Sequence, residues 1–333
     1  MTDKTISDFI LTGDTADVYF SRTQTILAKE GLDPVVVMEI FPGRAGILCG
    51  IDEVIDLLRA AAPDAQVDAL DEGAAMSEKE VVLRIRARYS TFGLYETALL
   101  GMLAHTTGWA TAAREIVDAA TPVPGISFGA RHVHPNVAAR LEYAAIVGGC
   151  IACATPAGAR LAGKPPSGTI PHAMVLIFGD TVKATEAFDK WMPRDINRIA
   201  LVDTFHDEAE EALRVARALG DRLWGIRLDT PSERGRVTPD LVKEVRARLN
   251  QAGYLNVKIV VSGGVDVERV KLFKETGAPI DAYGVGSAIS AAPPIDFTGD
   301  LKEIDGKPIA KRGRIPGITE NPRLKRITLK QPS

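Results

Sequence analysis

Val257-Lys258-Ile259-Val260-Val261-Ser262-Gly263-Gly264 is a short apolar strand pattern that ends in a glycine-rich turn. Ile280-Asp281-Ala282-Tyr283-Gly284-Val285-Gly286-Ser287 repeats this arrangement, and a helix pattern follows each turn. Such turns gather backbone N–H groups and the positive end of a helix dipole where an anion can rest. In an α/β barrel, the loops after the last two strands are the usual phosphate site. The turns therefore predict a phosphate cradle, the alternative being that they need glycine only for backbone geometry.

Short apolar strands alternate with amphipathic helices from Ile126 onward. This alternation indicates a parallel sheet, and its length indicates closure into an α/β barrel. Fewer than the eight strands of a full barrel are visible, which leaves an incomplete barrel open. The strands are expected at 126–128, 174–178, 199–203, 223–229, 257–262 and 280–284, with helices beginning at Glu208, Pro239 and Asp266.

The first third of the chain mixes strands and helices without one repeating unit, which is typical of an α+β lobe. Strands are expected at 35–41 and 81–87, and helices at 51–62 and 93–117. The tail is rich in Pro, Gly, Lys and Arg, so it should be extended and either pack back on the first lobe or fray. The expected division is an N-terminal α+β domain at 1–120, an α/β barrel at 121–290 and a C-terminal extension at 291–333.

Composition favours a globular protein that binds small molecules. The 333 residues are 46% hydrophobic, and the formal net charge of −3 offers no basic stripe for nucleic acid. No apolar run reaches the length that spans a bilayer, and residues 1–10 lack the pattern of a signal peptide. The odd count of 3 cysteines gives no disulfide framework, so we expect a cytoplasmic location. Cys150 and Cys153 should be small residues buried in an Ala/Gly-rich helix.

Residues suited to catalysis or binding follow the predicted strands. Phe128 offers a face for a flat ring, and Arg131 a planar fork for phosphate or carboxylate. Core packing and a helix-capping salt bridge are the respective alternatives. His172 ends a loop with three prolines just before a predicted strand, so it should be held rigidly, where it can donate, accept a proton or take a phosphoryl group. A histidine satisfied by the backbone is the alternative.

Two further strand ends carry aspartates. Asp203-Thr204 and Arg227-Leu228-Asp229 close successive strand patterns, where carboxylates can accept hydrogen bonds from sugar hydroxyls. Mg²⁺ prefers substrate phosphates plus one or two carboxylates, which makes Asp229 beside a diphosphate a candidate metal residue. Capping of the following helix is the alternative for each aspartate.

Taken together, the sequence resembles the nicotinate phosphoribosyltransferases, in their short archaeal-type branch, over nearly its whole length. The matching segments are the two glycine turns and residues 15–20, 46–50, 96–101, 127–131, 168–173 and 201–205. The resemblance implies a type II phosphoribosyltransferase with an irregular (β/α) TIM-like barrel beside the N-terminal lobe, working as a homodimer or larger homo-oligomer. It implies a reaction that joins nicotinate to 5-phosphoribosyl 1-diphosphate (PRPP), releases diphosphate and couples ATP hydrolysis to turnover in NAD salvage.

The resemblance also implies roles for individual residues. Phe128 would stack the pyridine ring, Tyr19 of a neighbouring subunit would close over it, and Arg131 would bind phosphate. His172 would contact diphosphate and be phosphorylated when ATP is used. Contacts with the rest of the substrate would come from Asp203, Thr204, Arg227 and Asp229, the last with Mg²⁺, and the 5-phosphate cradle from Ser262, Gly263, Gly264, Gly284, Gly286 and Ser287.

The sequence departs from the pattern of this family at two places, and two alternative functions stay open. Relatives can carry a cysteine-rich zinc segment near the C-terminus, whereas residues 291–333 contain no cysteine, so no zinc is expected. The turn at 229–233 also differs from the Asp-Ser-Gly-Asp turn of longer relatives. Quinolinate or nicotinamide could replace nicotinate as the base, although quinolinate should need more cations than Arg131 and Arg160 offer. A catalytically silent sensor of phosphorylated sugars is the alternative outside enzymes.

Overall fold

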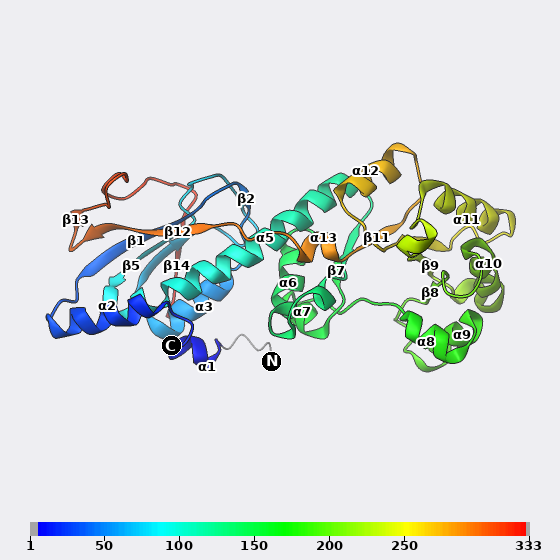
Figure 1. The fold of residues 1–333 in the computed structure, drawn as a ribbon, viewed down its shortest axis with the longest axis horizontal. Coiled ribbons are helices and arrows are strands. Elements are labelled where there is room, and N and C mark those ends of the chain that lie inside the picture. The colour runs from blue at the N-terminus through cyan, green and yellow to red at the C-terminus, as the bar shows by residue number, and fades with distance from the viewer. Residues whose placement is uncertain (1–5, 331–333) are drawn as a thin grey trace. The chain divides into compact units, whose positions relative to one another are not determined.

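The computed structural model describes residues 6–330, which form two compact units (Figure 1). The first unit comprises the described residues up to Thr111 and those from Ala292 onward, and the second comprises Ala112–Ala291. The boundary falls within the long helix α5 (Glu96–Ala120). No helix within 6–330 is both long and apolar enough to cross a bilayer.

The first unit is built on a six-stranded antiparallel sheet. Its strand order is β13 (Lys307–Pro308), β12 (Phe297–Ile304), β1 (Val35–Pro42), β5 (Leu83–Arg88), β3 (Gln66–Ala69) and β14 (Lys325–Ile327). The unit also holds α1 (Asp8–Leu11), α2 (Val18–Lys29), α3 (Ile51–Ala61), α4 (Tyr89–Phe92) and the short pair β2 (Gly46–Ile47) and β4 (Ala75–Met76).

Strand β5 illustrates how sequence alternation sets the two faces of this sheet. Leu83 and Ile85 are fully buried in the core of the unit. Arg84, between them, lies 2.8 Å from the carboxylate of Glu39 on the paired strand β1, and Arg86 lies 2.8 Å from Glu303. The strand predicted at 81–87 is confirmed, and its alternating apolar and basic residues make it half-buried.

The second unit is built on a curled, six-stranded parallel sheet, a half-barrel. Its order is β7 (Ala152–Cys153), β6 (Gly125–Ser127), β11 (Ala282–Val285), β10 (Lys258–Val261), β9 (Gly225–Leu228) and β8 (Ile199–Leu201), with β7 and β8 at the two ends. The helices of this unit are α6 (Pro135–Val147), α7 (Pro156–Leu161), α8 (His172–Phe178), α9 (Thr181–Trp191), α10 (Glu208–Leu219), α11 (Pro239–Gln251), α12 (Val267–Glu275) and α13 (Ser287–Ser290). The predicted parallel α/β arrangement is therefore confirmed.

One predicted strand is wrong. The apolar run at 174–178 lies in the helix α8, of which His172 is the first residue. Pro171 is extended and sits at the N-cap, and Gly179 ends the helix with a left-handed φ of 68°. A short apolar run fits either a strand or a helix by periodicity alone, and here only Val175 is fully buried.

The environment predicted for Cys150 and Cys153 is half right. Both thiols are free and buried, and burial raises the pKa of each to about 12. Neither lies in a helix, because α6 ends at Val147 before Gly148 and Gly149, the latter with a φ of 113°. Cys153 lies in β7, a strand that the sequence did not reveal.

Candidate active site

The predicted site residues of the second unit gather where its parallel strands end. Phe128 follows β6, Asp203 follows β8 and Asp229 follows β9, while Ser262 follows β10 and Gly286 follows β11. Because these strands are parallel and adjacent, their carboxyl ends form one edge of the sheet. We call this the carboxyl edge.

Arg227 connects three segments at the carboxyl edge. Its Nη1 donates to Oγ1 of Thr169 at 2.8 Å, and its Nη2 donates to Oδ2 of Asp229 at 3.0 Å. Its guanidinium carbon also lies 5.8 Å from the centroid of the Phe128 ring, within cation–π range. The side chain is only 14% exposed, so these contacts hold its charge in a fixed place.

Asp229 links this arginine to the first glycine turn. The hydroxyl of Ser262 donates to Oδ1 of Asp229 at 2.9 Å. A Cβ placed on Gly263 would lie 2.9 Å from the same oxygen, so the turn passes directly against the carboxylate. Both oxygens of Asp229 therefore have partners within the carboxyl edge.

His172 and Asp203 form a second contact between the loop before α8 and the end of β8. Nε2 of the half-exposed His172 lies 3.0 Å from Oδ2 of Asp203, whose side chain is 1% exposed. Burial raises the pKa of Asp203; the hydrogen bond and charge of His172 oppose this shift, and the charge of Asp229 adds to it. Among the described residues, Oδ1 of Asp203 and Oγ1 of Thr204 are buried without a hydrogen-bond partner.

The second glycine turn packs against Phe128. The backbone N–H of Phe128 donates to the carbonyl of Val285 at 2.7 Å. A Cβ on Gly284 would lie 2.6 Å from Cδ2 of Phe128 and 3.0 Å from Cβ of Ser262. A Cβ on Gly286 would lie 3.0 Å from Nε2 of His132. Glycine is thus needed here for close approach, and the second turn lies against both Phe128 and Ser262 of the first turn.

Three predicted site residues stand apart from this network. Arg131 is exposed, in the short helical turn after β6, and makes no hydrogen bond or ion pair with residues 6–330. Ser287 is exposed at the start of α13. Tyr19 lies in the first unit, on α2, where it is 56% exposed and donates to Oδ2 of Asp17 at 3.1 Å.

Two residues at the carboxyl edge were missed by the sequence reasoning. Thr169 accepts a hydrogen bond from Arg227. Its place inside the proline-rich loop that ends at His172 could have indicated that Thr169 belongs to the site. Arg236 lies against Gly264, which no local pattern reveals because the contact joins the loops after β9 and β10.

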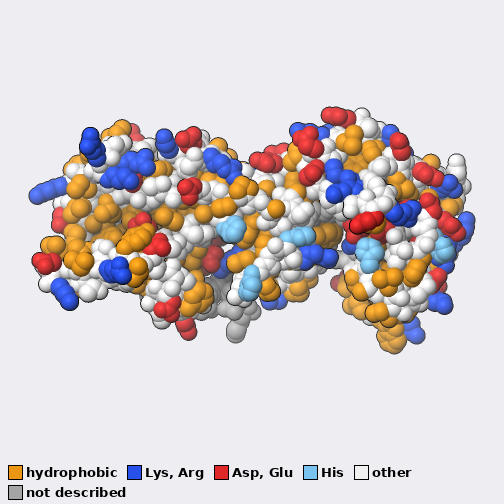
Figure 2. Space-filling view, in the orientation of Figure 1, with side chains coloured by type: hydrophobic (Ala, Val, Ile, Leu, Met, Phe, Trp, Pro, Cys, Tyr) orange, Lys and Arg blue, Asp and Glu red, His pale blue; other side chains and the backbone are white. Residues whose placement is uncertain are grey.

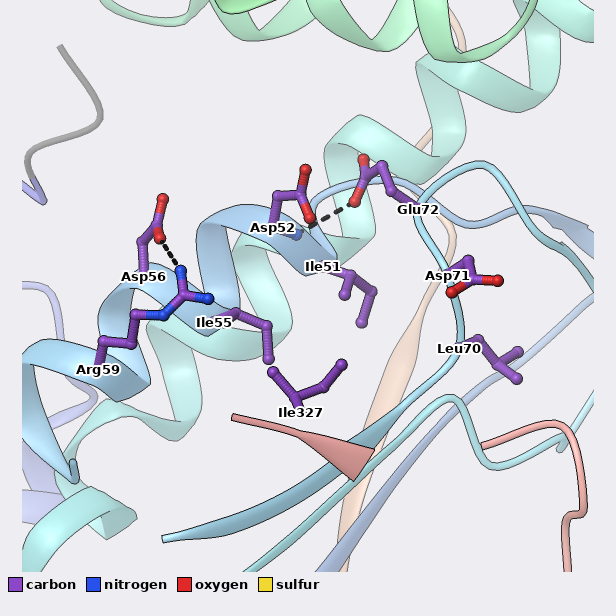
Figure 3. A pocket seen from close by; sticks show the side chains of 9 residues that line it. All are labelled: Ile51, Asp52, Ile55, Asp56, Arg59, Leu70, Asp71, Glu72 and Ile327. Atoms are coloured by element: carbon purple, nitrogen blue, oxygen red, sulfur yellow. Dashed lines mark hydrogen bonds and ion pairs between the residues drawn. The ribbon is translucent and has the colours of Figure 1, made fainter. Parts of the chain in front are cut away.

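A separate pocket of about 280 Å³ lies in the first unit, at the start of α3 (Figure 3). Glu72 fills part of its wall, accepting hydrogen bonds from the backbone N–H groups of Gly50 at 2.8 Å and Asp52 at 3.2 Å. Arg59 pairs with Asp56 at 2.6 Å on the same helix. The carboxylate of Glu72 therefore caps α3, and none of the predicted site residues lines this pocket.

A curled parallel sheet with charged side chains and glycine turns along its carboxyl edge is the architecture of an α/β enzyme that works at that edge. The chain belongs to the type II phosphoribosyltransferases: residues 17–107 match the family described as "Quinolinate phosphoribosyl transferase, N-terminal domain", and residues 109–300 match its C-terminal domain.

Similar proteins are named either as phosphoribosyltransferases or as a nucleotide pyrophosphorylase. The chain is 32% identical over 255 residues to nicotinate phosphoribosyltransferase pncB1 of Mycobacterium tuberculosis, covering 74% of this chain and 55% of that protein. It thus spans about half the length of this relative. A solved structure described as nicotinate-nucleotide pyrophosphorylase from Pyrococcus furiosus is 44% identical, with a TM-score of 0.87, over 94% of this chain and 81% of the other. Human nicotinic acid phosphoribosyltransferase shares the fold at 18% identity, with a TM-score of 0.73, over 91% of this chain and 77% of the other.

Proposed function

We propose that this chain is a nicotinate phosphoribosyltransferase, which forms nicotinate mononucleotide and diphosphate from nicotinate and PRPP. The observation that carries the proposal is the continuous contact from Phe128 through Arg227 and Asp229 to Ser262. It brings an aromatic face, a fixed cation, a carboxylate and the glycine turns to one edge. The curated relative named a nicotinate phosphoribosyltransferase supports nicotinate as the base.

The reaction breaks the bond between the anomeric carbon and the diphosphate and forms a bond from that carbon to the ring nitrogen of nicotinate. Its transition state has cationic character at the sugar and growing negative charge on the leaving group. Arg227, with Arg131 and His172, would stabilise the leaving diphosphate, whereas Asp203 and Asp229 would face the sugar. Phe128 would orient the pyridine ring by stacking. The ring nitrogen attacks, so no protein nucleophile is needed in this step.

Mg²⁺ fits the carboxylates at this edge. Asp203 and Asp229 are close enough for the charge of one to raise the pKa of the other, and Oδ1 of Asp203 is buried without a protein partner. Residues 6–330 hold no group of three or more His, Cys, Asp or Glu side chains that could bind a metal alone, so phosphate oxygens would supply the other ligands. Bound there, Mg²⁺ would neutralise charge on the diphosphate.

ATP is proposed as a co-substrate that phosphorylates His172. Its contact with the buried carboxylate of Asp203 supports this role, because the carboxylate fixes the ring. The cradle for the 5-phosphate is proposed at Gly263, Gly264, Gly284, Gly286, Ser262 and Ser287. Thr204, whose hydroxyl is buried without a described partner, would bind substrate beside Asp203.

We also propose a homo-oligomer in which Tyr19 of one subunit closes the base site of another. Exposed apolar side chains support this assembly. In the first unit they include Val18 and Tyr19 on α2, and in the second Ile177 at 83% exposure and Trp191 at 71%. Figure 2 shows apolar side chains gathered over α8 and α9. Exposed apolar patches are typical of protein–protein interfaces, which supports the proposed assembly.

We also propose the form of the barrel, the branch of the family and the cellular location of the protein. The half-barrel would be the wall of an irregular TIM-like barrel, a form that its curled parallel sheet supports. The chain would belong to the short archaeal-type branch of the family. Its three free, buried cysteines support a reducing, cytoplasmic location.

The test is to supply PRPP, Mg²⁺ and one base at a time, and to measure diphosphate release and the nucleotide formed. We expect the protein to convert nicotinate to its mononucleotide and release diphosphate, and we expect ATP to stimulate this turnover. Turnover of quinolinate alone, with release of carbon dioxide, would instead assign the activity named in the family description. Binding of PRPP without turnover of nicotinate, quinolinate or nicotinamide would indicate a sensor.

A further inference from the structure

The guanidinium of Arg236 lies directly against the first glycine turn. A Cβ placed on Gly264 would overlap Nη1 of Arg236 and lie 3.2 Å from its Cζ. The side chain of Arg236 makes no hydrogen bond or ion pair with any residue in 6–330. A cation is thus placed at the turn without a hydrogen-bonded or ion-paired acid among residues 6–330.

Hydrogen bonds on both sides of Arg236 fix the backbone that places its side chain at the glycine turn. Its N–H donates to the carbonyl of Pro231 at 3.1 Å, which closes the loop after β9. On the other side, Nη2 of Arg269 donates to the carbonyl of Val237 at 2.6 Å. Arg236 itself has a φ of 64°, a conformation that costs a non-glycine residue about 1 kcal/mol or more and persists only where surrounding contacts enforce it.

Two guanidinium groups and two carboxylates make up the charges around Arg236, namely Arg236 itself, Arg269, Asp266 and Glu233. Burial lowers the pKa of Arg269, and the charge of Arg236 lowers it further, so two guanidinium groups face one another. Asp266, near Arg269, already accepts a hydrogen bond from the N–H of that residue at 2.9 Å. Glu233 is the acid that faces Arg236. Its pKa is lowered mainly by its own N–H and by the Ser232 hydroxyl, with a smaller contribution from Arg236.

The glycine turn presents further donors at the same place. Gly263 and Gly264 have positive φ values of 85° and 68°, and their N–H groups donate to no acceptor within residues 6–330. Free backbone donors beside an unpaired guanidinium form a site for a compact oxyanion. We infer that Arg236 binds the 5-phosphate of the substrate at the Gly263–Gly264 turn, an inference that rests on the proposed function.

The test compares Arg236→Ala with Arg234→Ala in the full chain. Arg234 lies two positions away on the same loop, but its Nη2 faces Glu208 at 3.7 Å, so its removal deletes the same charge without touching the turn. Calorimetry with ribose 5-phosphate, which carries only the 5-phosphate, should show affinity falling about 10- to 100-fold in Arg236→Ala. The KM for PRPP should rise similarly, whereas Arg234→Ala should resemble the parent.

A second variant separates binding from folding. Arg236→Gly removes the guanidinium but suits the positive φ, so it should lose the same affinity while keeping or raising the melting temperature. Unchanged ribose 5-phosphate affinity in Arg236→Gly, with a parent that binds the probe, would overturn the inference. So would a loss of affinity confined to inorganic diphosphate. A parent that binds neither ribose 5-phosphate nor PRPP would instead overturn the proposed function.

Discussion

Nε2 of His172 lies 3.0 Å from Oδ2 of Asp203, and this contact ties the proline-rich loop to the end of β8. The carboxylate is buried whereas the imidazole is 40% exposed. One side of the ring is thus fixed by the protein, and the exposed part remains available to a ligand. The same loop is held a second time by the bond from Arg227 to Thr169.

Replacement of His172 by Ala should abolish ATP-stimulated turnover while leaving the fold intact, because the phosphoryl acceptor is lost. Asp203→Asn should reduce the ATP stimulation about tenfold, since it weakens a charge-assisted contact to the ring. Nucleotide formation with and without ATP, and phosphorus NMR of the protein, would measure both effects. Asp195→Asn, at an exposed position in the same unit, is the control. Full ATP stimulation in His172→Ala would remove the phosphohistidine role.

Thr169→Val should raise the KM for PRPP about tenfold, with a smaller change in kcat. The substitution keeps the shape of the side chain but removes the acceptor of a 2.8 Å bond from a largely buried guanidinium. Arg227 would then be less firmly placed for the diphosphate. Thr169→Ser retains the hydroxyl and should restore most of the affinity. Equal KM values for the Val and Ser variants would show that the bond does not position Arg227.

Gly284→Ala should weaken nicotinate binding and lower the melting temperature. Its Cβ would lie 2.6 Å from Cδ2 of Phe128, so the ring must move from its present place. The expected cost is about 1–3 kcal/mol of stability. Gly101→Ala is a matched control, because it lies within α5 with nothing within 4 Å of the added Cβ, and it should be neutral or stabilising. If both variants bind nicotinate equally well, Phe128 does not stack the base.

Glu96→Gln should flatten the pH dependence of stability. Burial, then the charges of Asp300 and Asp17, raise the pKa of Glu96 from about 4.5 to about 7. The folded state therefore holds this proton more tightly than the unfolded state, and stability falls as pH rises from about 4.5 to 7. After allowance for partial exposure, the variant should remove about 1–2 kcal/mol of that fall.

Urea unfolding at pH 5 and pH 8 would measure this effect. Glu115→Gln, at an exposed position of the same helix, should keep the pH dependence of the parent. An unaltered difference between the two pH values in Glu96→Gln would place the titration elsewhere.

Strands and helices were predicted correctly from the sequence where the local pattern of apolar residues was clear. The strands that became β5, β9 and β10 carry either clear alternation or a buried apolar run before a turn, and both patterns were interpreted correctly. The helix α8 was missed because its apolar run is short and its boundaries are set by Pro171 and Gly179. Within the site, Asp203 and Asp229 were correctly predicted to follow strands, because each comes directly after a largely apolar run in the sequence. The hydrogen bond from Arg227 to Thr169 could not be predicted, since these residues are 58 positions apart and meet only through tertiary folding.

Strand β1 lies between β5 and β12, and β12 follows the entire second unit in the chain. A ribosome therefore releases β1 long before the strand that pairs with it in register from Val36 to Pro42 has been synthesised. During that interval one edge of β1, including the apolar Val37 and Ile40, has no partner. The first unit can therefore complete its sheet only after the second unit, which is continuous in sequence, has been synthesised.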